Sequence, residues 1–343
     1  MLQHWRDDAY LAWKTELLRT ALRRAGYVDA DISKPIRTGP GERRRMDYAI
    51  RRIGGRIVLG LHRLRSADVI DLLECPVLHP TLMALFAPLR VLLSRVRALR
   101  HDGSAIVNLL DSGPDVLLRT DVALNIGDRI ALTEFARAHG LPRIAWAQGN
   151  DEPEPIAILR PPTTVLSGIS ITPPPGGFLQ ASASGEAAIT AAVLGALPAK
   201  GRIAELFAGC GSITFALAQR ARVAAWEGDP ASASALRAAA NHAGLPGRIA
   251  VTQRDLARQP LQAKELAGFA AVVLDPPAAG AATQVAQIAA AKVPVVVYVS
   301  CDPATLGRDA RLLSQAGYRL TAATPIDQFL WSARLESVCV FAR

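Results

Sequence analysis

Apolar and polar residues come in regular blocks along the second half of the chain. Apolar runs of strand length predict strands over 203–207, 222–226, 249–252, 270–274 and 293–299. Helical periodicity predicts helices over 184–197, 212–220, 230–243, 281–291 and 303–316, and a terminal β region follows over 318–341. Strands that alternate with helices predict an α/β fold with a mostly parallel, doubly wound, Rossmann-like sheet.

The first half has a different pattern, which predicts a mixed α+β region. Helical periodicity covers 5–26 and 81–98, and β structure is expected over 35–75 with a hairpin turn at Gly54-Gly55. Short strands are expected over 105–110, 115–120 and 129–132, before a short helix over 134–140. Seven prolines between Asp151 and Pro175 indicate a junction. We therefore expect an α+β central domain over 1–150, a Pro-rich linker over 151–177 and an α/β domain over 178–343.

The positive charge of the chain is concentrated near its beginning. The 343 residues carry a formal net charge of +9, and residues 1–100 hold 19 Lys and Arg against 10 Asp and Glu, whereas the remaining 20 and 20 balance. A basic region beside a neutral one favours a polyanionic partner, most simply nucleic acid. An arginine-rich protein from a GC-rich genome is the alternative.

Two groups of basic residues could contact RNA phosphates. The hairpin carries five arginines, for which a charged sheet face is the alternative: Arg43, Arg44, Arg45, Arg51 and Arg52. The first helix carries four basic residues that would contact phosphates or, more simply, form a solvated face: Lys14, Arg19, Arg23 and Arg24.

Membrane and secretory signals are not apparent in the sequence. No apolar stretch approaches the roughly 20 residues of a membrane span, and the N-terminus has no signal-peptide core. The four cysteines lie far apart and form no Cys-x-x-Cys pair. We therefore expect a cytoplasmic monomer that has no disulfide framework and binds neither membrane nor DNA.

A glycine turn follows the strand predicted over 203–207. Gly209 and Gly211 lie between this strand and a helix, so the backbone can approach a ligand closely beside free helix N–H groups. Glu227 follows the next strand, 16 residues beyond Gly211, where a carboxylate can bind a ribose diol. Asp255 and Asp275 follow two later strands, and Asp255 is placed to accept from an adenine amino group. A plain βα turn is the alternative.

These features together resemble the layout of class I S-adenosylmethionine methyltransferases. A dehydrogenase fits less well, because the turn has two glycines rather than three and Asp275-Pro276-Pro277 has no role there. Asp-Pro-Pro alone would indicate an amino-methyltransferase.

Cys301 distinguishes these chemistries. It follows the strand over 293–299 and precedes a helix whose N-terminus would favour the thiolate. Carbon 5 of a pyrimidine becomes nucleophilic when a thiolate adds to carbon 6, and a base must afterwards remove the carbon 5 proton. Cys301 is thus a candidate nucleophile, with a small buried hydrophobe as the alternative.

Over nearly its whole length, from about Leu2, the chain resembles the RNA (uracil-5-)-methyltransferases, in particular their bacterial 23S rRNA branch. Four motifs carry the resemblance: Phe178-Leu179-Gln180, Leu206–Ser212, Val299–Asp309, and Asp327-Gln328-Phe329 followed by Leu335-Glu336. The resemblance implies that Cys301 is the nucleophile and Glu336 the base. It implies S-adenosylmethionine contacts for Gln180, Phe207, Gly209, Gly211, Ser212, Glu227, Asp255 and Asp275.

The chain departs from the family's motifs at several positions. Ala278 replaces the arginine of Asp-Pro-Pro-Arg, Asp302 replaces the asparagine of Cys-Asn-Pro, and Arg334 lies where a histidine precedes the base. Related members hold a [4Fe–4S] cluster with three upstream cysteines and a fourth at the position of Cys75, and they carry an N-terminal β-barrel. Because Cys75 alone cannot hold a cluster, we expect neither a [4Fe–4S] cluster nor another metal in this chain.

The sequence therefore predicts methyl transfer from S-adenosylmethionine to carbon 5 of a uridine in structured RNA, through a covalent cysteine adduct. The resemblance favours ribosomal RNA over transfer RNA. A cytosine-5 RNA methyltransferase is a second reading, although Ala278 and Ala279 stand where its second cysteine is expected. A third reading is a non-catalytic RNA-binding or ribosome-assembly protein.

Overall fold

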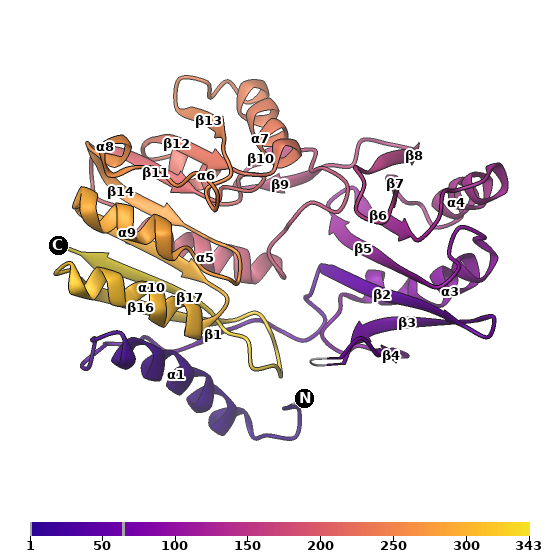
Figure 1. Cartoon of the computed structure of the whole chain (residues 1–343), viewed down its shortest axis with the longest axis horizontal. Helices are drawn as coiled ribbons and strands as arrows, with labels where there is room; N and C mark the ends of the chain where they lie inside the picture. The colour runs from indigo at the N-terminus through magenta and orange to yellow at the C-terminus, as the bar shows by residue number, and fades with distance from the viewer. Residues whose placement is uncertain (1, 64–65) are drawn as a thin grey trace. The chain divides into compact units, whose positions relative to one another are not determined.

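The computed structural model describes residues 2–63 and 66–343, and the chain divides into two compact units (Figure 1). The larger unit consists of Met1–Thr38, Leu166–Ile169 and Ala183–Arg343, and the smaller of Gly39–Val165 and Ser170–Ser182. These units differ from the predicted ranges of 1–150 and 178–343. The first 38 residues join the C-terminal part of the chain, and residues 170–182 join the central part.

An eight-stranded sheet forms the centre of the larger unit. Its strand order is β1-β16-β17-β15-β14-β11-β12-β13, and all neighbours are parallel except β17, which runs antiparallel to both β15 and β16. The bounds are β1 Ile36–Arg37, β11 Arg202–Leu206, β12 Arg222–Glu227, β13 Ile249–Gln253, β14 Phe269–Leu274, β15 Val295–Ser300, β16 Arg319–Asp327 and β17 Glu336–Ala342. The prediction of a mostly parallel, Rossmann-like α/β sheet is confirmed.

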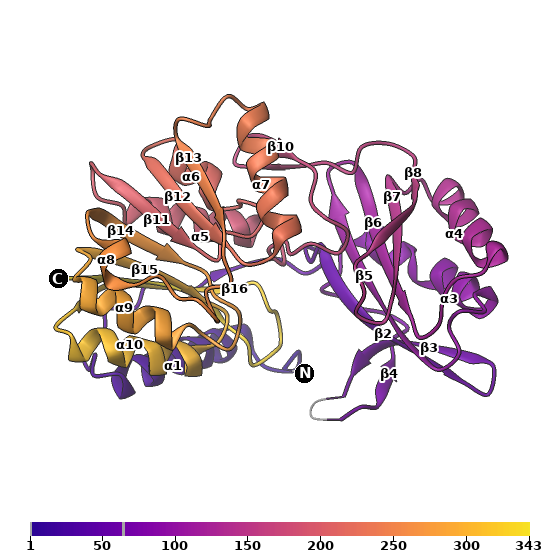
Figure 2. The same ribbon diagram turned by 45° about the horizontal axis from the view of Figure 1, so that its top comes forward.

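Helices cover both faces of this sheet (Figure 2). One face carries α1 (Asp7–Arg24), α8 (Ala263–Leu266), α9 (Ala282–Ala291) and α10 (Pro303–Gln315), and the other carries α5 (Ala183–Gly195), α6 (Thr214–Ala218) and α7 (Pro230–His242). Leu18 and Leu22 of α1 are fully buried in the same apolar cluster as Leu306 and Leu313 of α10. This burial explains why the first helix belongs to the C-terminal unit.

The smaller unit is built on a seven-stranded sheet of order β4-β3-β2-β5-β6-β7-β8. Its strands are β2 Arg45–Ile53, β3 Arg56–His62, β4 Val69–Asp71, β5 Asp102–Leu110, β6 Gly113–Thr120, β7 Arg143–Gln148 and β8 Glu154–Ile158. The predicted hairpin is confirmed, since β2 and β3 pair across Gly54-Gly55. Residues 170–182 belong here because Asn108 Nδ2 donates to Gly177 O at 2.8 Å and Arg143 Nη2 donates to Pro173 O at 3.0 Å.

Two local predictions for the smaller unit are wrong, and two of its strands were missed. The strand expected over 129–132 lies inside α4 (Ile126–Ala138), because Asn125 and Asp128 form a capping box that starts a helix there. The helix expected over 81–98 is two helices, α2 (Pro80–Ala84) and α3 (Phe86–Arg95). Strands β7 and β8 were not predicted, although β7 is buried over most of its length.

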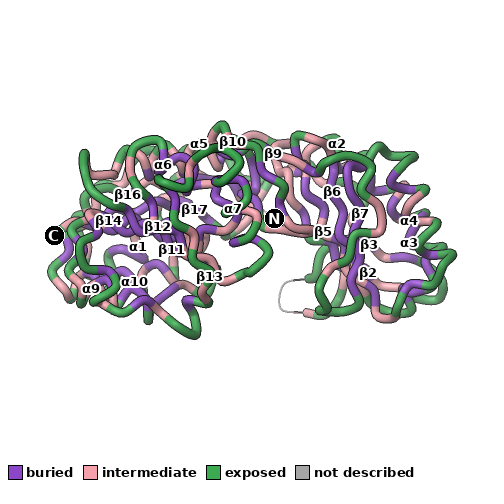
Figure 3. Tube along the Cα trace, turned by 90° about the horizontal axis from the view of Figure 1, so that it is seen from above, coloured by how far each residue is buried: buried purple, intermediate pink, exposed green. Residues whose placement is uncertain are grey.

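Short connections complete the architecture. Strands β9 (Thr164–Leu166) and β10 (Ile169–Ile171) form a two-stranded sheet within the stretch predicted to be a linker. The central strands of both large sheets are buried along most of their length (Figure 3).

No helix among the described residues is long and apolar enough to cross a membrane.

Candidate active site

The carboxyl ends of the parallel strands in the larger unit gather the predicted site residues at one sheet edge. Leu206, Leu274 and Tyr298 are register partners on β11, β14 and β15. Phe207 and Asp275 directly follow two of these partners, and Cys301 follows the last residue of β15. In open α/β sheets, ligands bind at this edge, where the strand order reverses.

The turn after β11 has two glycines with different surroundings. Phe207, Gly209 and Gly211 have positive φ angles of 63°, 55° and 102°. A Cβ on Gly211 would lie 2.5 Å from Leu236 Cδ1, so the protein itself fills the space there. A Cβ on Gly209 would meet no atom within 4 Å. The open side of the turn is therefore at Gly209, where a ligand can approach the backbone.

Glu227 connects the turns after β11 and β12. Its Oε2 accepts from the Gly209 N–H and its Oε1 from the Asp229 N–H, both at 2.7 Å. The side chain is half-buried, and carboxylate oxygens can accept further hydrogen bonds. The open space at Gly209 beside this carboxylate fits a ribose-bearing cofactor. Ser212 lies in the same turn, and its main-chain oxygen accepts from Ser167 Oγ at 3.4 Å.

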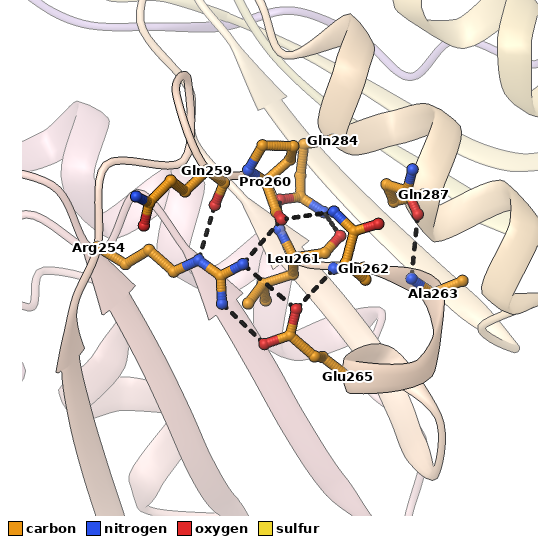
Figure 4. Close-up of polar contacts among 9 residues, drawn as sticks. All are labelled: Arg254, Gln259, Pro260, Leu261, Gln262, Ala263, Glu265, Gln284 and Gln287. Atoms are coloured by element: carbon orange, nitrogen blue, oxygen red, sulfur yellow. Dashed lines mark hydrogen bonds and ion pairs between the residues drawn. The ribbon is translucent and has the colours of Figure 1, made fainter.

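Asp255 follows β13 at the same edge and precedes a segment held by Arg254 (Figure 4). The Arg254 guanidinium donates to Gln259 O and Pro260 O and pairs with Glu265 at 2.7 Å. The Asp255 carboxylate accepts from the Ala257 and Arg258 N–H groups. The same segment is held from α9: Gln284 exchanges two hydrogen bonds with the Leu261 main chain, and Gln287 accepts from the Ala263 N–H. These contacts fix the backbone that presents Asp255.

Glu205 is a buried carboxyl group that the sequence analysis did not single out. It lies on β11, is 2% exposed, and its Oε2 has no hydrogen-bond partner among the described residues. Burial, with the neighbouring carboxylates of Asp275 and Glu227, raises the pKa of Glu205 to about 8. Its position two residues before Phe207 at a strand end was the available sequence signal.

Cys301 is a half-buried free thiol. Burial raises its pKa to about 11, and Glu336, Asp275 and Asp302 raise it while Arg334 lowers it. The expectation that the α10 N-terminus favours the thiolate stays a prediction. In the structure the Asp302 side chain occupies that terminus, since its Oδ1 accepts from the Ala304 and Thr305 N–H groups at 2.8 and 3.3 Å.

Glu336 is brought beside Cys301 by the antiparallel pairing of β15 and β17. Ser300 and Ser337 are register partners, so the next residues outward are Cys301 and Glu336. The Glu336 side chain is 3% exposed, and Gln328 Nε2 donates to its Oε2 at 2.8 Å. Its Oε1 has no hydrogen-bond partner among the described residues. Burial, followed by the nearby Asp275 carboxylate, raises the pKa of Glu336 to about 8.

The loop after Asp275 is fastened to α10. Asp309 Oδ2 accepts from Tyr298 Oη at 2.7 Å and from the Ala281 N–H at 2.6 Å. Arg308 pairs with the same carboxylate and donates to Ala279 O at 2.8 Å. Ala278, where the family has an arginine, is exposed in this loop. Arg334, where the family has a histidine, is exposed and lies 3.7 Å from the Asp302 carboxylate.

The structure places the other predicted site residues in the smaller unit. Gln180 is 3% exposed, and its main-chain oxygen accepts from Arg44 Nε at 3.1 Å. Cys75 is half-buried and free. Among residues 2–63 and 66–343, no group of three or more His, Cys, Asp or Glu side chains is placed to hold a metal ion.

The hairpin arginines have unequal freedom to bind RNA. Arg52 donates to the main-chain oxygens of Leu93, Ser94, Val96 and Leu99, so it caps the end of α3. Arg51 pairs with Asp102 at 2.7 Å, and Arg45 lies over the exposed ring of Phe178. Arg43 Nε donates to Arg45 O. Arg52 is therefore a structural residue, which corrects its assignment as an RNA contact.

Lys14 differs most from its sequence-based interpretation. It was expected on a solvated helix face, but its side chain is 0% exposed and its ammonium group lies 2.8 Å from Asp327 Oδ1. Position 14 lies between Tyr10 and Leu18 at a spacing of four residues, so its place on the buried face of α1 was the available signal.

Comparisons with known proteins agree with this arrangement. A family model described as tRNA (Uracil-5-)-methyltransferase matches residues 250–343. An uncharacterized RNA methyltransferase of Brucella suis is 38% identical over 100% of this chain and 81% of its own length. The 23S rRNA (uracil(1939)-C(5))-methyltransferase RlmD of Aeromonas salmonicida is 33% identical over 99% of this chain and 79% of its own length.

A solved structure supports the fold. The tRNA (uracil-54, C5)-methyltransferase of Pyrococcus abyssi, determined in complex with S-adenosyl-L-homocysteine, has a TM-score of 0.76 to this chain. The alignment covers 99% of this chain and 85% of that protein, at 18% sequence identity.

Proposed function

The chain belongs to the RNA (uracil-5-)-methyltransferase family, and we propose that it methylates carbon 5 of a uridine in 23S ribosomal RNA. It is an S-adenosylmethionine-dependent RNA methyltransferase. The observation that carries the proposal is the pairing of the Cys301 thiol with the buried Glu336 carboxyl group at the edge that holds the glycine turn. The RlmD relative supports a ribosomal target. Transfer RNA is the second candidate, favoured by the family description.

Residues at the carboxyl edge would hold the cofactor, which supplies the methyl group when bound. Glu227 is suited to the ribose hydroxyls, since its carboxylate lies beside the open side of the Gly209 turn. Gly211 shapes this turn, and Asp255 is suited to the adenine amino group. The remaining assigned contacts are Phe207, Ser212, Asp275 and Gln180.

Cys301 and Glu336 would carry the covalent chemistry. The Cys301 thiol loses its proton to solvent, and the thiolate sulfur forms a bond with carbon 6 of the uracil as the carbon 5–carbon 6 π bond breaks. The negative charge moves to the carbon 4 oxygen, and the resulting enolate makes carbon 5 nucleophilic. After carbon 5 has received the methyl group, Glu336 removes the carbon 5 proton, the carbon–sulfur bond breaks, and the thiolate leaves. Glu336 suits this step because its Oε1 makes no hydrogen bond among the described residues. Both groups must be deprotonated, so the rate should rise with pH.

The RNA would be held by the basic smaller unit. Arg43, Arg44, Arg45 and Arg51 remain the proposed backbone contacts, and Arg52 is omitted because main-chain oxygens of its own unit occupy its guanidinium. The target uridine must leave its stack to reach Cys301, so we infer a flipped base. The protein would act as a monomer in the cytoplasm, in keeping with its four free cysteines.

Product identification tests the proposal. Purified protein is incubated with labelled S-adenosylmethionine and total RNA from cells that lack the gene, and the nucleosides are identified by mass. We expect 5-methyluridine in 23S rRNA with the wild type and with Cys75→Ala, the matched cysteine control, and none with Cys301→Ala. Label in transfer RNA would move the assignment to the second candidate. A Cys301→Ala variant that still forms 5-methyluridine would refute the covalent mechanism.

A further inference from the structure

The ammonium group of Lys14 holds the loop between β16 and β17. It lies 2.8 Å from Asp327 Oδ1, donates to Phe329 O at 3.3 Å, and donates to Arg334 O. These acceptors lie at the beginning and the end of the loop, which spans residues 328–335. A buried ammonium group with three acceptors satisfies all three of its donors, so it connects both ends of the loop to α1.

A second contact from the N-terminal segment holds the middle of the same loop. Trp331 has a φ of 57°, a strained value for a bulky side chain. Its N–H donates to Tyr10 Oη at 2.8 Å, and its oxygen accepts from the Leu2 N–H at 3.0 Å. Both main-chain groups of the strained residue are thus held by residues that precede or belong to α1.

The loop in turn determines where the Glu336 carboxyl group lies. Asp327 is the last residue of β16 and Glu336 the first residue of β17. Gln328, directly after Asp327, donates to Glu336 Oε2 at 2.8 Å, and Arg334 lies two residues before Glu336. Lys14 therefore contacts both residues that flank Gln328, the partner of Glu336, and also contacts Arg334, which lies two residues before Glu336.

We propose that α1 positions the Glu336 carboxyl group, and that Lys14 and Tyr10 are positioning residues for the removal of the carbon 5 proton. The inference rests on the proposed function, in which Glu336 is the base. A purely stabilising role for α1 is carried by other residues, since Leu18 and Leu22 bury its apolar face in the cluster that also holds Leu306 and Leu313 of α10, and their side chains cannot hydrogen-bond to the loop. Lys14 and Tyr10 connect the helix to the active-site loop.

The test uses Lys14→Met/Asp327→Asn in the full chain. Lys14→Met alone would leave a buried, unpaired carboxylate and could unfold the protein, whereas the double variant removes both charges with little change in shape. Leu18→Ala is the matched control on the same helix. Tyr10→Phe is a second, milder variant that removes the hydroxyl group, which accepts from the Trp331 N–H and interacts with the Asp327 carboxylate.

Two measurements distinguish positioning from stability. Hydrogen–deuterium exchange of peptides from 328–335 should rise about tenfold in the double variant and at Trp331 in Tyr10→Phe, the effect of losing about one hydrogen bond. In turnover, kcat should fall about tenfold and the apparent KM for RNA should fall with it, because the slowed step follows methyl transfer. The methylated covalent protein–RNA adduct should accumulate for the same reason. Leu18→Ala should lower the melting temperature without either effect.

Loop exchange and adduct fraction equal to wild type in both Tyr10→Phe and the folded double variant would overturn the inference. If the double variant does not fold, Tyr10→Phe decides by the same two readings. Failure of the proposed function has a different signature: wild type would form no 5-methyluridine, or Glu336→Gln would turn over normally. The exchange measurement would still show whether α1 holds the loop.

Discussion

The two halves of the carboxyl edge in the larger unit are built in different ways. On the cofactor side, Glu227 holds Gly209 and Asp229, which lie 18 and 2 residues away in the sequence. On the nucleophile side, Lys14 reaches Asp327 and Arg334 across 313 and 320 residues. The first half is a local structure of two neighbouring βα turns, whereas the second half depends on a helix from the other end of the chain.

Raised pKa values occur on both sides of this edge, since burial raises the pKa of Glu205 on β11 to about 8. On the nucleophile side, burial and neighbouring carboxylates raise the pKa of Cys301 to about 11 and that of Glu336 to about 8. Both groups therefore hold their protons more tightly than the free side chains do, and the proposed mechanism must remove these protons before each group acts. On the cofactor side, the Glu227 carboxyl group is half-exposed beside the open side of the Gly209 turn.

The largest expected effect is on the nucleophile side, from Glu336→Gln. The amide keeps the shape of the side chain and can accept from Gln328, but it cannot take the carbon 5 proton. We expect turnover to fall by roughly 10²–10⁴-fold, the range for loss of a general base. Methyl transfer to the bound uracil should still occur once, so a methylated covalent adduct should be visible by denaturing electrophoresis.

A variant with no turnover and no adduct would place Glu336 earlier in the reaction than we propose. Gln328→Glu is not a suitable control, because it puts a second carboxyl group beside the first. Glu134→Gln, a change at an exposed position of helix α4 in the smaller unit, is the better one and should keep wild-type turnover.

The turns of the cofactor side and the strand-end position of Cys301 were predictable, whereas the residues that distant parts of the chain bring to the nucleophile side were not. The glycine turn and Glu227 follow from short-range patterns, because strand, turn and helix signals lie next to one another in the sequence. Glu336 could be assigned only through the family's last motif, since many carboxylates stand near strand ends. Lys14 was interpreted as solvated because nothing in the sequence near α1 shows that Asp327 lies against it.

The same reasoning explains the errors in the fold. The parallel sheet was predicted because each strand is a buried apolar run, whereas Arg129–Leu132 looks like a strand and becomes helical through its cap at Asn125. The first helix was assigned to the wrong unit, because a periodic pattern predicts a helix but not its packing partner.

The two glycines sharpen the comparison on the cofactor side. Gly211→Ala would place a Cβ 2.5 Å from Leu236 at a φ of 102°, so we expect a loss of about 3 kcal/mol in the free energy of unfolding. Gly209→Ala meets open space at a φ of 55° and should cost only about 1 kcal/mol. Relative to the stability that each variant loses, Gly209→Ala should weaken cofactor binding more than Gly211→Ala does, because the methyl group added at position 209 enters the proposed site.

Urea denaturation and calorimetric titration with S-adenosylhomocysteine measure both quantities. If the ratio of lost affinity to lost stability is the same in the two variants, Gly209 serves only the shape of the turn. The open space beside Gly209 would then not be a ligand site.

The raised carboxyl pKa values predict that stability falls as pH rises. Glu205 and Glu336 have pKa values of about 8, above the ordinary 4.5, so the folded protein binds more protons than the unfolded chain between these values. Their stabilising effect is fully present below pH 4.5 and is lost as pH rises through about 8. The slope should be at most about 1.4 kcal/mol per pH unit for each group.

Glu205→Gln should remove about half of that slope in urea denaturation between pH 5.5 and pH 8.5. Glu152→Gln, a change at an exposed position, should leave the slope unaltered. A slope in Glu205→Gln identical to that of wild type would show that Glu205 has an ordinary pKa.

The smallest expected effect tests Arg334, where this chain departs from its family. Four charged groups act on the Cys301 thiol: Glu336, Asp275 and Asp302 raise its pKa, and Arg334 alone lowers it. Arg334→Gln should therefore raise the thiol pKa and lower kcat at pH 7.5 by about threefold, since the side chain is more than half exposed and screened by solvent. The deficit should shrink as pH rises, because more of the thiol is then ionised in both proteins. Lys14 bonds the main-chain oxygen of Arg334, so this substitution leaves the loop held and should not trap the adduct. A pH-independent deficit would instead make Arg334 a substrate contact, in the place where the family uses a histidine.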